Sequence, residues 1–103
     1  MEPKLQKSEL GLKLEFVNEK AAKWKFSNCI QRTNQDHCFK MQRNSINYNY
    51  EHKKLRIKQQ MCIKMIKIEQ VPPNIIEKYY KCMKNIENSY KDLTQHYFEL
   101  FNE

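Results

Sequence analysis

The sequence predicts an all-α protein: a helical hairpin or three-helix arrangement with a long C-terminal helix and an extended N-terminal arm. Gly11 is the one glycine among 103 residues, so the turns of a β-sandwich or barrel would be hard to build. Lys, Glu, Gln, Ile and Leu are abundant, which favours helices. Apolar residues of the C-terminal third also recur at helical spacing.

The N-terminal segment has a different pattern from the rest of the chain. Leucines and a phenylalanine alternate with other residues, at Leu10, Leu12, Leu14 and Phe16, and a period of two is typical of extended backbone. We therefore expect residues 1–18 to form an extended arm that lies on a neighbouring protein. The alternative is a disordered or poorly periodic helical terminus.

The remaining residues, 19–103, are expected to form one helical domain, with helices at about 19–43, 50–70 and 73–101. Asn18 can cap the first helix, the polar stretch 33–36 can interrupt it, and residues 44–49 read as a turn. The second helix is expected to bury one arc and to expose a basic face on the opposite side. The apolar arc contains Leu55, Ile57, Met61, Cys62, Met65, Ile66 and Ile68, and the basic face contains Lys53, Arg56, Lys64 and Lys67.

Pro72 and Pro73 should end the second helix and begin the third, since proline fits the first turn of a helix. The third helix carries an unbroken seam at spacings of three and four: Ile76, Tyr79, Met83, Ile86, Tyr90, Leu93, Tyr97 and Leu100. At 1.5 Å per residue it is about 40 Å long and should overhang a second helix of about 30 Å. We therefore expect a partner protein to cover its end. The predicted partner-binding residues are Leu12, Leu14, Phe16, Trp24, Leu93, Tyr97, Phe98, Leu100 and Phe101.

Four cysteines, Cys29, Cys38, Cys62 and Cys82, are disulfide candidates, with four reduced thiols as the alternative. On one continuous helix Cys29 and Cys38 would lie about 13 Å apart along the axis, too far to pair unless the helix breaks. Cys38 and Cys62 are equidistant from a turn at position 50, and Cys62 and Cys82 from the turn at Pro72. Spacing alone therefore leaves the pairing open.

The string from Asn28-Cys29 to His37-Cys38-Phe39, followed by two later cysteines, resembles the CHCH (coiled-coil-helix-coiled-coil-helix) family, whose hallmark is twin Cys-x9-Cys. The first spacing here is Cys-x8-Cys, and the second is twice the expected length and contains two prolines. The resemblance implies a helical hairpin with bridges Cys29–Cys82 and Cys38–Cys62. It also implies the mitochondrial intermembrane space or an inner-membrane-associated site, with the cytosol as the alternative.

The net charge of +7 favours anionic partners, such as acidic protein surfaces, anionic lipid headgroups or RNA. RNA ranks behind the others because Arg32, Arg43 and Arg56 are the chain's few arginines. No apolar run is long enough to span a bilayer. We expect other subunits of a large complex to be the partners.

No pattern of residues predicts catalysis, a cofactor or a metal site. The cysteines lack the short knuckles of zinc modules, no glycine-rich phosphate loop exists, and the histidines have no nucleophile at a known spacing. We therefore expect a non-catalytic accessory subunit of a mitochondrial assembly, in particular a respiratory-chain complex. The alternatives are a basic protein of a ribonucleoprotein such as the mitochondrial ribosome, and a cytosolic microtubule-associated scaffold with reduced cysteines.

Overall fold

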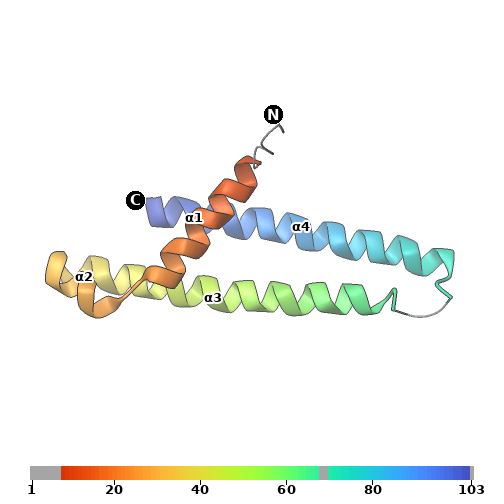
Figure 1. The fold of residues 1–103 in the computed structure, drawn as a ribbon, viewed down its shortest axis with the longest axis horizontal. Coiled ribbons are helices and arrows are strands. Elements are labelled where there is room, and N and C mark those ends of the chain that lie inside the picture. Colours follow the sequence, from red (N-terminus) through yellow and green to blue (C-terminus); the bar gives the residue numbers. More distant parts are fainter. Residues whose placement is uncertain (1–7, 68–69, 103) are drawn as a thin grey trace, which may run out of the picture.

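The structure, a computed structural model, describes residues 8–67 and 70–102, and these form four helices and no strand. The helices are α1 (Glu9–Lys23), α2 (Phe26–Arg32), α3 (Gln35–Lys64) and α4 (Pro73–Asn102). Two long antiparallel helices, α3 and α4, form a hairpin, and α1 crosses both of them near the C-terminal end of α4 (Figure 1). The predicted all-α fold with a long C-terminal helix is confirmed.

The predicted extended arm is wrong for residues 9–18, which belong to α1, while residues 1–7 lie outside the described part of the chain. The Ser8 hydroxyl caps α1 by accepting a hydrogen bond from the Gly11 N–H at 3.1 Å. A second pattern coexists with the alternation that indicated a strand. Leu10, Leu14, Val17 and Ala21 follow spacings of four, three and four, and this face packs on the hairpin. Leu12 falls outside that face and is exposed.

The helix expected at 19–43 and the turn expected at 44–49 are replaced by two breaks and one long helix. Trp24 and Lys25 have extended backbone between α1 and α2, and Thr33 and Asn34 have extended backbone between α2 and α3. The Asn34 side chain caps α3 by accepting a hydrogen bond from the His37 N–H at 2.7 Å. From there α3 continues through the polar residues 44–49 to Lys64.

Two side chains of the segment 44–49 form hydrogen bonds with α1. The Ser45 hydroxyl donates to the Ala21 carbonyl at 3.0 Å, and the Tyr48 hydroxyl donates to the Asn18 side-chain oxygen. Both acceptors are distant in sequence, so the local composition of residues 44–49 does not indicate that these side chains form hydrogen bonds with α1. The contacts hold the middle of α3 against α1 rather than in a turn.

The main core lies where α1, α3 and α4 meet, and it is built around five buried residues: Val17, Ala21, Tyr48, Tyr97 and Phe101. Tyr97 lies edge-on to Tyr48 at 5.4 Å between ring centroids, and Phe16 lies edge-on to Phe98 at 5.2 Å. Edge-to-face aromatic pairs at this separation add to the stability that apolar burial provides. Three helices thus share one aromatic core at one end of the hairpin.

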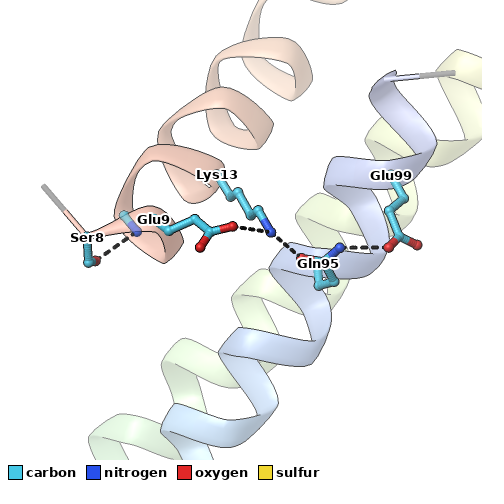
Figure 2. Close-up of polar contacts among 6 residues, drawn as sticks. Ser8, Glu9, Lys13, Gln95 and Glu99 are labelled. Atoms are coloured by element: carbon cyan, nitrogen blue, oxygen red, sulfur yellow. Dashed lines mark hydrogen bonds and ion pairs between the residues drawn. The ribbon is translucent and has the colours of Figure 1, made fainter.

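A polar bridge reinforces the crossing of α1 over α4 (Figure 2). The Lys13 ammonium donates to the Gln95 side-chain oxygen at 2.7 Å and lies 3.3 Å from the Glu9 carboxylate. The same ammonium lies 5.3 Å from the centroid of the Phe98 ring. The stem of Lys13 therefore covers the edge of the aromatic core while its charge stays near solvent.

Candidate interaction surface

Two disulfides join the four cysteines: Cys29–Cys38 and Cys62–Cys82. The break at Thr33 and Asn34 allows the first pair, because it turns α2 back along α3 and brings the two Cα atoms to 5.7 Å. The bridges that the CHCH resemblance implies, Cys29–Cys82 and Cys38–Cys62, are not those of the structure. The predicted oxidation of all four candidates fits the two bridges observed.

The Cys62–Cys82 bridge ties α3 to α4 near the turn of the hairpin, with Cα atoms 5.8 Å apart. Its position agrees with the symmetry of these two residues about Pro72. Cys62 is fully buried. On α4, Ile86 lies about one turn after Cys82 and is also buried. The hairpin is therefore held by a covalent link near its turn and by the aromatic core at its other end.

Most of the predicted partner-binding residues of α4 are taken up by the chain itself. Tyr97 and Phe101 are buried in the core, and Leu93, Phe98 and Leu100 pack against it. The expected overhang does not occur because α1, which was predicted to be extended, lies across this end of α4. On α1, Phe16 also packs against the core, Leu14 is half-buried, and Leu12 is exposed.

Trp24, the remaining predicted contact residue, is half-buried in the extended link between α1 and α2. It lines an open hollow of about 320 Å³ beside the first disulfide, and its indole N–H is buried without an acceptor. Lys23, Lys25, Arg32 and His37 also line the hollow. This hollow is therefore lined by basic side chains together with one indole ring.

The four residues of the predicted basic face, Lys53, Arg56, Lys64 and Lys67, are all exposed. Lys53 and Lys64 lie on the side of α3 that points away from α4, whereas Arg56 lies close enough to His52 and Tyr90 to act on both. Lys67 follows the end of α3. The buried arc is also narrower than expected: Leu55 and Cys62 are buried, Ile57 and Met61 are exposed beside the lysines, and Ile68 lies outside the described residues.

A row of exposed apolar residues runs along the outer side of α3, and we call it the outer stripe. Its members are between 45% and 62% exposed, although all are large apolar or aromatic side chains. At 100° per residue they fall within an arc of about 60°, opposite the core residues Tyr48 and Leu55, and they span about 33 Å. The outer stripe consists of Phe39, Ile46, Tyr50, Ile57 and Met61.

The outer stripe was not among the predicted sites, although its spacing of seven, four, seven and four was present in the sequence. The turn assumed at 44–49 divided it between two helices, which hid the repeat. Large apolar side chains collected on one helix face are typical of a surface that meets another molecule. The outer stripe is therefore the candidate interaction surface.

A hollow lies on the N-terminal part of the outer stripe. It measures about 220 Å³ and is lined by Phe39, Gln42, Arg43, Ile46 and Asn47. The cation–π contact between Lys54 and Tyr50, with the ammonium 4.8 Å from the ring centroid, lies further along the same face. The surface therefore combines apolar groups, a depression and positive charge.

Burial in the hairpin shifts the pKa values of Tyr48 and His52. Burial raises the pKa of Tyr48 to about 12, with a smaller contribution from Tyr90, so its hydroxyl stays protonated and donates to Asn18. Burial, and then the positive charge of Arg56, lowers the pKa of His52, whose ring lies between Tyr48 and Tyr90 at 5.5 and 5.6 Å. Among the described residues, His, Cys, Asp and Glu do not gather in groups of three that could hold a metal ion.

None of the four helices, over the residues described, has an apolar stretch that could cross a membrane. No known protein-family model matches the chain, and no curated protein and no solved structure matches it.

Proposed function

We propose that this chain is a non-catalytic structural subunit that joins a larger protein assembly through the outer stripe of α3. The observation that carries the proposal is the exposure of five large apolar side chains on one helix face, opposite the core. Burying such side chains contributes roughly 25 cal/mol per Å² of apolar surface, which is a strong reason for association.

The two disulfides support an oxidising compartment, because cytosolic reductants keep most intracellular thiols reduced. We propose the mitochondrial intermembrane space, and within it an accessory role in a respiratory-chain complex. The local string from Asn28 to Phe39 supports this choice through its likeness to the CHCH family.

The size of the native particle tests the proposal. The tagged chain, expressed in its own cells and separated by native electrophoresis, should migrate with a large species. The double variant Ile46→Ser/Ile57→Ser should migrate at the monomer size while keeping its helicity and both disulfides. The matched control, Ile76→Ser/Tyr80→Ser, removes exposed apolar side chains from α4 and should leave the large species intact.

Two results would contradict the proposal. Wild-type protein that migrates as a monomer would contradict the proposal that the chain belongs to a larger assembly. Four alkylatable thiols in protein extracted without reductant would contradict the proposal of an oxidising compartment.

A further inference from the structure

The hollow on the outer stripe has the geometry of a socket for a side chain from another helix. Phe39, Gln42, Arg43 and Ile46 line it at positions i, i+3, i+4 and i+7. In helix–helix packing of the coiled-coil type, a side chain of one helix enters a hole formed by four residues at this spacing on the other. The spacing therefore suits a side chain that projects from a partner helix.

The residues of the outer stripe repeat every eleven positions. This repeat determines how far a partner helix can stay in contact with α3. Phe39, Tyr50 and Met61 are eleven residues apart, and Ile46 and Ile57 occupy a second equivalent position. An eleven-residue repeat corresponds to about 3.67 residues per turn, close to a straight α-helix. A partner helix can therefore lie alongside α3 over the whole length of the outer stripe, about 33 Å.

The charges around the outer stripe are of one sign. Arg43 and Lys54, also eleven residues apart, lie on one side of it, and Lys53 and Lys64 lie on the other. Between residues 39 and 64 the sole acidic residue is Glu51, which lies toward α4 and forms an exposed ion pair with Lys54 at 3.4 Å. A second copy of this chain would bring further positive charge, since the net charge is +7. Complementarity requires a negatively charged partner.

We propose that the outer stripe binds an acidic amphipathic helix of a partner protein. This inference rests on the proposed function and adds the chemistry of the partner. An apolar side chain of that helix enters the hollow between Phe39 and Ile46, and its apolar row covers Tyr50, Ile57 and Met61. Its Asp or Glu residues lie on both sides of that row and face Arg43 and Lys54 on one side and Lys53 and Lys64 on the other.

Site-directed photocrosslinking of the full-length chain in its own cells tests this partner. Benzoylphenylalanine placed at Ile57 should crosslink to one peptide segment, identified by mass spectrometry. That segment should carry apolar residues at helical spacing and net negative charge. The same probe at Asn88, an exposed position on α4, should not label the segment. Crosslinking at Ile57 to a neutral or basic segment, to this chain itself or to lipid would overturn the inference.

A charge-reversal variant separates the inference from the proposed function. Arg43→Glu/Lys54→Glu should weaken the association by roughly 10- to 100-fold, as like charges would then face the partner. The control Lys78→Glu/Lys84→Glu makes the same charge change on α4 and should leave the association unchanged. If Ile46→Ser/Ile57→Ser dissociates the complex but the reversal does not, the partner is not acidic and the proposed function stands. If wild-type protein is monomeric, the proposed function itself fails.

A vesicle experiment addresses the membrane as the competing occupant. Purified chain should not float with phosphatidylcholine–phosphatidylserine vesicles at physiological salt. Flotation that Ile46→Ser/Ile57→Ser abolishes would assign the outer stripe to a lipid surface and overturn the inference.

Discussion

The Tyr48 hydroxyl donates a hydrogen bond to the Asn18 side chain, and this contact joins α3 to α1 across 30 residues of sequence. Tyr48 is 2% exposed, so the donor is shielded from water. Replacing Tyr48 with Phe should lower the free energy of unfolding by about 1 kcal/mol, because it leaves the buried ring in place but removes the hydrogen bond. Tyr50→Phe, an exposed change two residues away, should leave it unchanged in the same urea titration. Equal stabilities for the two variants would show that the bond contributes nothing.

The docking of α1 depends on Val17, which is fully buried between α3 and α4. Val17→Ala should destabilise the protein by roughly 1–3 kcal/mol, since the lost methyl groups leave a cavity in the core. Leu12→Ala on the same helix should cost less than about 0.5 kcal/mol because Leu12 is exposed. Thermal unfolding followed by circular dichroism measures both. The reverse order would mean that α1 packs through another face.

On α3 the same contrast separates the core face from the outer stripe. Leu55→Ala should cost roughly 2–5 kcal/mol, as Leu55 is buried toward α4. Ile57→Ala, two residues along, should change the stability of the isolated chain by less than about 0.5 kcal/mol. A large loss at Ile57 in the isolated chain would indicate that the outer stripe is already covered within the chain.

The two disulfides should have different effects when they are removed. Cys62→Ser/Cys82→Ser should reduce the free energy of unfolding by about 3 kcal/mol, because the bridge restricts the unfolded hairpin across 20 residues of sequence. Cys29→Ser/Cys38→Ser should mainly release α2, whose packing contacts among the described helices are with α3. Hydrogen exchange should then rise in residues 26–33 and stay slow in the core of α3 and α4. Uniform loss of protection in both variants would contradict this division.

The stability of the hairpin should fall in acid through His52. Its pKa is lower in the folded protein than the ordinary value of 6.5, mainly because of burial and also because of Arg56. The unfolded chain therefore binds more protons, so stability is greatest above pH 6.5 and is lost as pH falls from there through the lowered pKa. Urea unfolding at a series of pH values should show this loss in the wild type and a smaller one in His52→Gln.

The long helix α4 could be predicted because its apolar residues repeat without interruption and Pro72 and Pro73 mark its start. The second bridge was among the predicted options for the same reason, since Cys62 and Cys82 are symmetric about that turn. For α4, local periodicity was sufficient, because the helix carries one uninterrupted apolar seam.

Elements that depend on distant contacts could not be predicted in this way. Residues 9–18 carry both an alternating and a helical pattern, and only packing on α3 and α4 selects the helix. Residues 44–49 look like a turn until Ser45 and Tyr48 find acceptors on α1. Both errors concern the packing of α1 on the hairpin, and they led to a third. The end of α4 was expected to need a partner protein, although α1 already covers it.

The hairpin is held at both ends, by the aromatic core under α1 and by the Cys62–Cys82 bridge. This arrangement lowers the free-energy cost of binding a partner. The backbone of α3 is ordered before any partner arrives, so association does not have to overcome the conformational entropy of forming that helix. An excised peptide of residues 35–64 would be only marginally helical in water and would have to fold as it binds. The intact chain is thus a preorganised rod, whose recognition energy goes into affinity instead of into folding.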